Sequence, residues 1–282
     1  MSRKHYALIG YPIGHSMSTF IHKRLFELSN IDAEYKSISV HPHYLKSVFP
    51  DLRNLDGFNI TIPHKQKIIP LLDCLSKKSL LCRSVNTVKN GNFSEGFNTD
   101  SLGFIKALEE NDVKLRGKTA IIGNGGVASS IAYECALHGC EVIIIARPSS
   151  IDKASKLADK IRNDIKFSNI SVCTNQTICG DIDLLINATP VGMYPKTHEC
   201  PVFADTILNS CTVFDAIYNP KDTIFLKIAR SNGIKAIGGM SMLIWQAVES
   251  HKIWNDSIFN YDDILQLEED ATRELKKLFY ED

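Results

Sequence analysis

The stretch Gly123-Asn124-Gly125-Gly126-Val127-Ala128 decides the fold of this chain. It fits the pattern G-x-G-x-x-G/A and stands between a short apolar run, Thr119–Ile122, and a helical pattern over Gly126–Leu137. In such a loop the first glycine allows a tight turn, the second lets a pyrophosphate approach the backbone, and the small last residue lets the helix pack on the sheet. The phosphates then meet the free N–H groups of the helix N-terminus. The stretch therefore predicts a dinucleotide-binding strand–loop–helix, and the alternative is a glycine-rich turn without a ligand. The predicted cofactor-binding residues are Gly123, Asn124, Gly125, Gly126, Val127 and Ala128.

The end of the next strand distinguishes the two common dinucleotides. The apolar run Glu141–Ala146 predicts that strand, and NAD sites usually place a carboxylate at its end to bind the ribose 2′-hydroxyl. Here Arg147 and Pro148 follow the strand, and a guanidinium suits a 2′-phosphate. We therefore expect NADP as the cofactor, although Asp152 lies nearby and Arg147 could also be a solvated surface arginine.

Outward from this loop, strand and helix patterns alternate along the chain. We expect further strands at His5–Ile9, Tyr35–Val40, Gly57–Ile62, Val85–Lys89, Leu184–Asn187, Val213–Ala216 and Lys235–Ile237. We expect further helices at Thr19–Leu28, Lys65–Leu72, Leu102–Glu110, Ile151–Arg162, Thr223–Ser231, Met242–Trp254 and Asp262–Phe279. Pro63 suits the first turn of its helix, and Asn90-Gly91 is a hairpin signal. The alternation predicts the α/β class, with parallel sheets and crossover helices.

Composition excludes several other classes of protein. The 282 residues are 44% hydrophobic and 23% charged, with 32 basic and 32 acidic side chains, so a nucleic-acid partner is not expected. No apolar run is long enough for a membrane span or a signal peptide. The eight cysteines form no C-x-x-C pair, which argues against a metal site and for reduced thiols in the cytoplasm.

Seven polar motifs in a fixed order carry a resemblance that covers nearly the whole chain. Four precede the glycine loop: Gly10–Ser18, Asn59–Lys65, Ser84–Val88 and Gly96–Gly103. Three follow it: Asn187–Met193, Asp215–Pro220 and Gly239–Gln246. Together these motifs closely resemble the shikimate dehydrogenase family, although any one of them alone would read as a turn or a helix cap.

The resemblance implies two domains. An N-terminal α/β substrate-binding and catalytic domain is expected at residues 1–103, and a Rossmann-type NADP-binding domain at residues 104–239. The last helices, within residues 240–282, are expected to return to the first domain and complete it. A monomer or homodimer is expected.

The resemblance also implies the site residues. Lys65 and Asp100 would flank the reacting hydroxyl and handle its proton as the catalytic pair. Residues implied in substrate binding are Ser16, Ser18, Thr61, Asn86, Tyr218 and Gln246. Thr189 and Gly239 would lie near the cofactor, and His15 and His64 receive no role. Without the resemblance, Lys65 would read as an exposed lysine and Asp100 as a helix N-cap.

The expected activity is the NADP-dependent, reversible oxidation of shikimate to 3-dehydroshikimate, in aromatic amino-acid and chorismate biosynthesis. One alternative is a quinate/shikimate dehydrogenase that uses NAD or NADP, and the other is an NADP-binding sensor without turnover. The chain departs from the family pattern at Thr19, Lys23, Pro148 and Ser241. These changes leave the substrate preference and the NADP/NAD ratio open, and Ser241 is expected near the nicotinamide.

Overall fold

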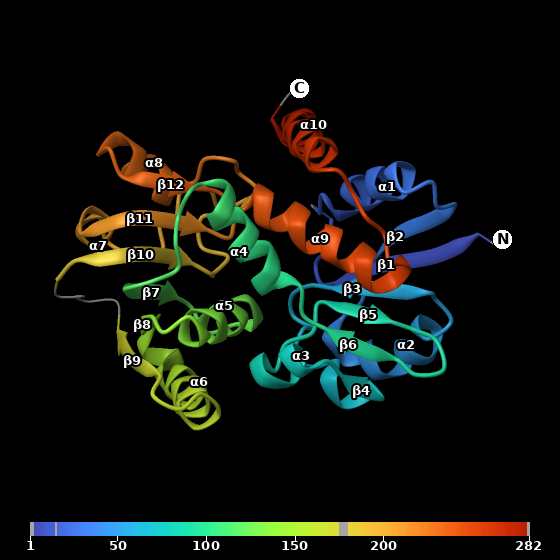
Figure 1. Cartoon of the computed structure of the whole chain (residues 1–282), viewed down its shortest axis with the longest axis horizontal. Helices are drawn as coiled ribbons and strands as arrows, with labels where there is room; N and C mark the ends of the chain where they lie inside the picture. The colour runs from blue at the N-terminus through green and yellow to red at the C-terminus, as the bar shows by residue number, and fades with distance from the viewer. Residues whose placement is uncertain (1–2, 15, 175–179, 281–282) are drawn as a thin grey trace. The chain divides into compact units, whose positions relative to one another are not determined.

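The computed structural model describes residues 3–14, 16–174 and 180–280, which form two compact units (Figure 1). Unit 1 consists of Met1–Gly103 together with Ile244–Asp282, and unit 2 is Phe104–Leu243. Unit 1 therefore takes residues from both ends of the chain. The chain passes between the units inside two helices, α4 (Asp100–Glu110) and α9 (Met240–Asn255).

The sheet of unit 1 has six strands in the order β2-β1-β3-β5-β6-β4. The bounds are β1 Lys4–Gly10, β2 Ala33–Ser39, β3 Gly57–Ile60, β4 Cys74–Leu75, β5 Thr87–Lys89 and β6 Glu95–Phe97. Strands β1, β2 and β3 run parallel to one another, whereas β5 runs antiparallel to both β3 and β6. The predicted parallel arrangement therefore holds for β1, β2 and β3 but is wrong for β5, because the hairpin signalled by Asn90-Gly91 reverses the chain between β5 and β6.

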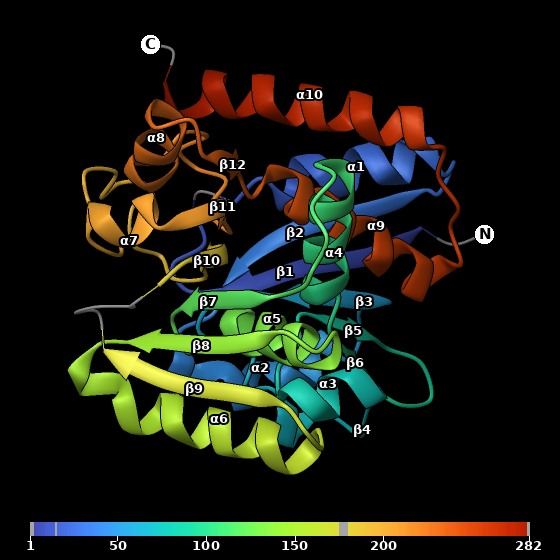
Figure 2. The same cartoon turned by 60° about the vertical axis from the view of Figure 1, so that its left-hand side comes forward.

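The two faces of this sheet are covered by different helices. The bounds are α1 Ser18–Leu28, α2 Leu45–Leu52, α3 Lys77–Cys82 and α10 Tyr261–Phe279. Along β1, Ala7 and Ile9 face the apolar cluster that holds Phe49 of α2, while Tyr6 and Leu8 face the cluster that holds Trp254 of α9. This alternation is the two-residue period of a strand buried on both sides. Helix α10 lies beside α1 in both views (Figures 1 and 2).

Helix α9 completes unit 1 from the far end of the chain. The Trp254 indole donates a hydrogen bond of 2.9 Å to the Val88 carbonyl, and a Cβ at Gly57 would lie 2.4 Å from the indole nitrogen. The expected return of the C-terminal helices to the first domain is therefore confirmed.

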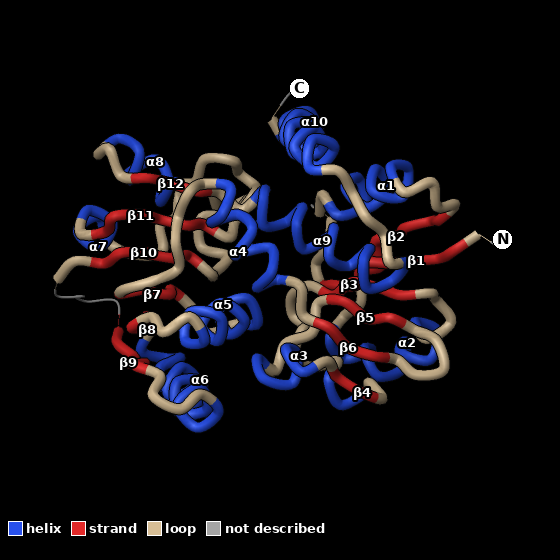
Figure 3. The backbone as a smooth tube through the Cα atoms, viewed as in Figure 1, coloured by secondary structure: helices blue, strands red, loops and turns tan. Residues whose placement is uncertain are grey.

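Unit 2 contains a six-stranded parallel sheet in the order β9-β8-β7-β10-β11-β12 (red in Figure 3). The bounds are β7 Lys118–Ile122, β8 Glu141–Ala146, β9 Asn169–Thr174, β10 Ile182–Asn187, β11 Ser210–Asp215 and β12 Lys235–Ile237. Numbered within the unit, this order is 3-2-1-4-5-6, the strand order of the dinucleotide-binding Rossmann fold. The predicted α/β fold with a Rossmann-type unit is confirmed.

Helices cover this parallel sheet in two groups. The bounds are α5 Gly126–Leu137, α6 Ile151–Asp164, α7 Ala204–Leu208 and α8 Ile224–Ser231. Helix α5 packs on β7 and β8, α6 runs along β8 and β9 (Figure 2), and α7 and α8 pack on β11. The cluster that joins Ile122, Val213 and Phe225 is the main core on the α7–α8 side.

One predicted helix is absent from the structure. The segment predicted as the helix Lys65–Leu72 forms turns and a short 3₁₀ helix, η2 (Ile69–Leu71). Long-range contacts hold it in this shape: the Val85 N–H donates to the Lys65 carbonyl at 2.8 Å, and the buried His64 ring bonds the Val40 carbonyl at 2.7 Å. Tertiary contacts here override the local helical pattern.

No helix in residues 3–14, 16–174 or 180–280 is long and apolar enough to cross a membrane. The seven described cysteines carry free thiols, and Cys179 lies outside the described residues.

Candidate active site

The first part of the site lies where the parallel strands β1 and β3 end in unit 1. The Thr61 N–H donates to the Ile9 carbonyl at 2.9 Å, and a Cβ at Gly10 would lie 2.5 Å from Thr61 Cγ2. Only glycine fits at this close approach. The loop that leaves β1 carries Ser16 and reaches Ser18, the first residue of α1, and the two serine hydroxyls lie 3.0 Å apart. The fold thus directs Thr61 and the serine-bearing loop to the same edge of the sheet.

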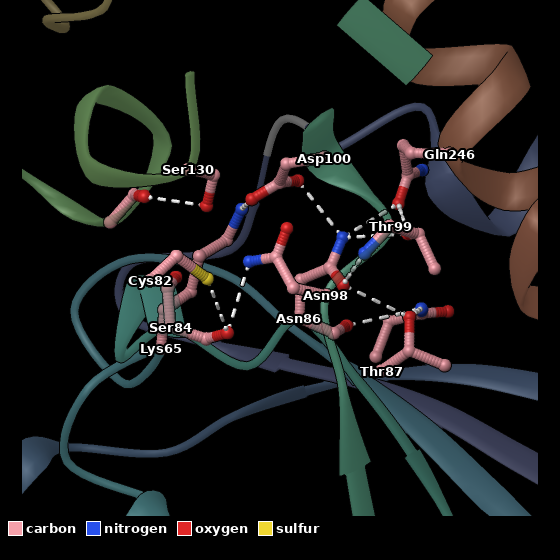
Figure 4. Close-up of polar contacts among 12 residues, drawn as sticks. Lys65, Cys82, Ser84, Asn86, Thr87, Asn98, Thr99, Asp100, Ser130 and Gln246 are labelled. Atoms are coloured by element: carbon pink, nitrogen blue, oxygen red, sulfur yellow. Dashed lines mark hydrogen bonds and ion pairs between the residues drawn. The ribbon is translucent and has the colours of Figure 1, made fainter. Parts of the chain in front are cut away.

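Lys65 and Asp100 form a nearly buried ion pair. Lys65 Nζ lies 2.7 Å from Asp100 Oδ2, and the two side chains are only 12% and 6% exposed (Figure 4). The two alternative interpretations were therefore wrong: Lys65 is not an exposed lysine, and Asp100 is the first residue of α4 with its carboxylate turned to the lysine. A lysine and a carboxylate in contact can accept, hold and return a proton.

Asn86 holds the other oxygen of the Asp100 carboxylate. Its Nδ2 donates to Asp100 Oδ1 and to Thr99 Oγ1, both at 2.9 Å, and to Gln246 Oε1 at 3.3 Å (Figure 4). Its Oδ1 accepts the Thr99 backbone N–H at 2.8 Å, which fixes the amide with its nitrogen toward Asp100. Both carboxylate oxygens of Asp100 are therefore oriented by neighbours, one by an ammonium and one by an amide.

His64 anchors the segment that presents Lys65. Its ring is fully buried, and Nε2 lies 2.7 Å from the Val40 carbonyl, so Nε2 carries the proton. Burial lowers the pKa of His64 and favours its neutral form. His15, which lies in the motif Gly10–Ser18, is outside the described residues.

The glycine loop of unit 2 follows β7, at the point where the strand order reverses between β7 and β10. Gly123 has φ +111°, and a Cβ there would lie 2.8 Å from Thr189 Cγ2, in the loop after β10. Gly125 is the N-cap of α5, and a Cβ there would meet no atom within 4 Å. A tight turn and an open helix N-terminus at this position are the features that accept a pyrophosphate.

Among the other residues predicted to bind the cofactor, two have side chains that are hydrogen-bonded within the protein. Asn124 Nδ2 donates to the Ser150 carbonyl at 2.9 Å, and Thr189 Oγ1 donates to Asn187 Oδ1 at 2.7 Å. Gly239 lies against the chain after β11, where a Cβ would lie 2.5 Å from the Ala216 carbonyl oxygen. The Arg147 side chain is exposed, and its guanidinium has no ion pair or hydrogen bond to the described part of the chain.

Asp215 was included in the motif Asp215–Pro220, but its carboxylate was given no role from the sequence. Asp215 ends β11 and accepts hydrogen bonds from Asn187 Nδ2 at 3.0 Å, the Ile217 N–H at 3.0 Å and Thr223 Oγ1 at 2.6 Å. Burial raises the pKa of Asp215 to about 6, although these three donors act in the opposite direction. A polar residue at the end of a buried parallel strand was the available signal.

Tyr218 and two positions that depart from the family pattern, Ser241 and Thr19, complete the set of predicted site residues. Tyr218 follows β11 in unit 2, whereas the other residues predicted to bind substrate belong to unit 1. The Ser241 hydroxyl donates to the Glu110 carboxylate, so its proton is used within unit 2. Thr19 Oγ1 lies 3.0 Å from the Ser37 hydroxyl on β2.

Comparison with known proteins relates almost the entire chain to one family. A family model described as the shikimate dehydrogenase substrate binding domain matches residues 8–88, and one described as NADP oxidoreductase coenzyme F420-dependent matches residues 118–213. The shikimate dehydrogenase (NADP(+)) of Caldanaerobacter subterraneus subsp. tengcongensis is 38% identical over 265 residues, which cover 92% of this chain and 94% of that protein. The chain belongs to the shikimate dehydrogenase family.

Other members of the shikimate dehydrogenase family agree with this assignment. The shikimate dehydrogenase (NADP(+)) of Methanocaldococcus jannaschii is 36% identical over 257 residues, covering 88% of this chain and 89% of that protein. A crystal structure of a shikimate dehydrogenase in complex with NADP+ superposes with a TM-score of 0.87 at 34% identity, over 95% of this chain and 96% of that one. The Thermus thermophilus enzyme, solved with NADP(H) and shikimate, gives a TM-score of 0.84 at 26% identity, over 95% and 99%.

Proposed function

We propose that this chain is an NADP-dependent shikimate dehydrogenase, which reversibly oxidises one ring hydroxyl of shikimate to give 3-dehydroshikimate. The reaction belongs to aromatic amino-acid and chorismate biosynthesis. A relative that is 38% identical over 92% of this chain supports the assignment. Relatives named for the NADP-dependent activity, and related structures that contain NADP and shikimate, support the cofactor and the substrate.

The nearly buried Lys65–Asp100 pair is the observation that carries the proposal. When the secondary alcohol is oxidised, its hydride leaves to the nicotinamide, which is the chemistry that NADP supplies when bound. The hydroxyl proton must go to the protein, and the Lys65–Asp100 ion pair is placed to receive it. In the reverse direction, the Lys65 ammonium hydrogen-bonds the ketone oxygen and returns the proton.

Polar side chains of the motifs are assigned to the substrate. We assign Ser16 and Ser18 to its carboxylate, because their hydroxyls lie together at the start of α1. Thr61, Asn86 and Gln246 are assigned to the ring hydroxyls or carboxylate, and Tyr218 of unit 2 is assigned to the same role. A site with buried hydrogen-bonding partners rejects an analogue that lacks a matching group, because those partners are left unpaired.

The residues of the glycine loop fit NADP. Gly123, Asn124, Gly125, Gly126, Val127 and Ala128 form the turn and the helix N-terminus assigned to the pyrophosphate, and Thr189 lies against Gly123. Gly239, which packs against Ala216, is assigned to the same cofactor. Arg147, exposed and without a partner among the described residues, is assigned to the 2′-phosphate. We further propose a cytoplasmic location, which the free thiols of the described cysteines support, and a monomeric or homodimeric state.

The deciding experiment follows the absorbance of reduced nicotinamide with purified protein, shikimate or quinate, and NADP or NAD. Rapid reduction of NADP with shikimate is the expected result. Activity confined to quinate or to NAD would move the chain to the quinate-oxidising branch. No turnover with any pair, together with retained NADP binding, would instead make it a nucleotide-binding sensor.

A further inference from the structure

A group of buried polar side chains lies against Asn86. It joins Tyr35 of β2, Asn59 of β3, Thr87 of β5 and Ser250 of α9, and each of these residues is at most 8% exposed. None of them belongs to the catalytic pair or to the residues assigned to substrate. Buried polar groups in such a cluster are costly unless they satisfy one another, so their arrangement is tightly fixed.

Thr87 is the centre of this group. Its hydroxyl donates to Asn86 Oδ1 at 3.2 Å, accepts from Asn59 Nδ2 at 3.0 Å and lies 2.9 Å from Ser250 Oγ. One hydroxyl thus touches the amide of Asn86 and two side chains from other elements, and Figure 4 shows Thr87 next to Asn86.

The surrounding hydrogen bonds fix the direction in which this hydroxyl acts. Tyr35 donates its phenolic proton to Asn59 Oδ1 at 2.8 Å, so the Asn59 amide nitrogen must face Thr87 and Ser250. Ser250 donates its own proton to the Gln246 carbonyl at 2.9 Å, one turn back in α9. The Thr87 hydroxyl therefore accepts from Asn59, and it shares its proton between Asn86 Oδ1 at 3.2 Å and Ser250 Oγ at 2.9 Å.

We propose that Thr87 is a positioning residue for the oxidation, which acts through Asn86 on the carboxylate of Asp100. The inference rests on the proposed function. Asn86 donates to Asp100 Oδ1 at 2.9 Å. A hydrogen bond that fixes the orientation of the Asn86 amide therefore also fixes the orientation of the Asp100 carboxylate beside Lys65. Catalysis is sensitive to such alignment, because small displacements of a reacting group slow the reaction strongly.

The test removes the Thr87 hydroxyl while keeping the shape of the side chain. Thr87→Val is nearly isosteric and suits a strand, so we expect a folded protein with NADP affinity unchanged and kcat reduced about tenfold, the loss expected for one hydrogen bond. Thr87→Ser keeps the hydroxyl and removes only the methyl group, and it should recover most of the wild-type kcat. Thr212→Val, at a buried threonine of β11 in the other unit, is the matched control and should leave kcat unchanged.

A double-mutant cycle then asks whether Thr87 acts through Asn86. In an Asn86→Ala background, assayed at high enzyme concentration, Thr87→Val should cause no further loss of kcat. The same loss in both backgrounds would overturn the inference, as would a serine variant as slow as the valine variant. An inactive wild-type protein would remove the proposed function itself, whereas an active wild type matched by Thr87→Val would remove this inference alone.

Discussion

Lys65 and Asp100, 35 positions apart in the sequence, meet at 2.7 Å with both side chains almost hidden from solvent. Replacing Lys65 by alanine removes the ammonium and leaves the carboxylate without its partner. We expect Lys65→Ala to lower kcat by about 10²–10⁴-fold, the usual contribution of a positioned acid–base group. NADP affinity should remain unchanged, because the glycine loop lies in the other unit.

A matched control for this variant is available two residues along the same segment. Lys67 is exposed, and Lys67→Ala removes the same charge outside the ion pair. Its kcat should equal that of the wild type in the nicotinamide absorbance assay. A wild-type rate for Lys65→Ala would contradict the catalytic assignment.

Arg147 tests the choice between NADP and NAD. The side chain is exposed at the end of β8, so its loss should disturb little of the fold. Arg147→Ala should weaken NADP binding by roughly 10–100-fold, because a hydrogen bond between charged groups contributes about 1.5–3 kcal/mol. NAD lacks the 2′-phosphate and serves as the internal control in titration calorimetry. Equal weakening of both dinucleotides would exclude the 2′-phosphate role.

Gly123 and Gly139 provide a pair of variants that separates backbone strain from crowding. Both have positive φ, +111° and +76°, but only a Cβ at Gly123 would meet a neighbour, 2.8 Å from Thr189 Cγ2. Gly139→Ala should cost about 1 kcal/mol of stability from strain and leave NADP affinity intact. Gly123→Ala should cost more and also weaken NADP binding, measured by thermal unfolding and titration. Equal effects of the two variants on NADP affinity would count against the loop assignment.

The buried pair His22 and His251 predicts loss of stability in acid. Their ring nitrogens lie 3.1 Å apart and both rings are fully buried. Burial lowers the pKa of His251 to about 3 and that of His22 well below its usual value. The unfolded chain binds protons near pH 6.5 and the folded chain does not, so the free energy of unfolding falls as the pH drops below about 6.5.

The size of this effect can be measured by urea unfolding between pH 7 and pH 5. Each histidine that stays neutral in the folded state contributes a slope of about 1.4 kcal/mol per pH unit below its unfolded pKa. The double variant His22→Phe/His251→Phe should therefore lose stability less steeply, while His198→Ala, at an exposed position, should follow the wild type. Parallel curves for the double variant and the wild type would show that the pair does not control the acid response.

Local patterns predicted the parallel unit best. The bounds of α5, β8 and β12 agree with the prediction to the residue. A short apolar run marks each of these strands, and Gly139 and Gly233 mark the ends of the helices before β8 and β12. Unit 1 was harder to predict. Helix α2 was missed because Pro50 lies inside it, although Leu45, Val48, Phe49 and Leu52 are spaced as on a buried helix face.

The site could be predicted only in part, because contacts between residues far apart in the sequence shape it. Lys65 and Asp100 were named from motifs, but the sequence places Lys65 in a helix that the structure lacks. The contacts that shape this segment come from Val40 and Val85, which periodicity cannot associate with it. Thr87 and Asn59 lie in two of the polar motifs, Ser84–Val88 and Asn59–Lys65, but received no role, because their polar contacts depend on Ser250 of α9.

The division of unit 1 between the two ends of the chain has a consequence for synthesis on the ribosome. Unit 2 is continuous, so it can fold as soon as it emerges, whereas the sheet of unit 1 must wait for α9. The wait is roughly 140 residues of translation, or roughly 7–28 s at 5–20 residues per second. During that time Tyr6 and Leu8 lack the cover of Trp254, so the nascent N-terminal sheet exposes an apolar face that a chaperone can bind.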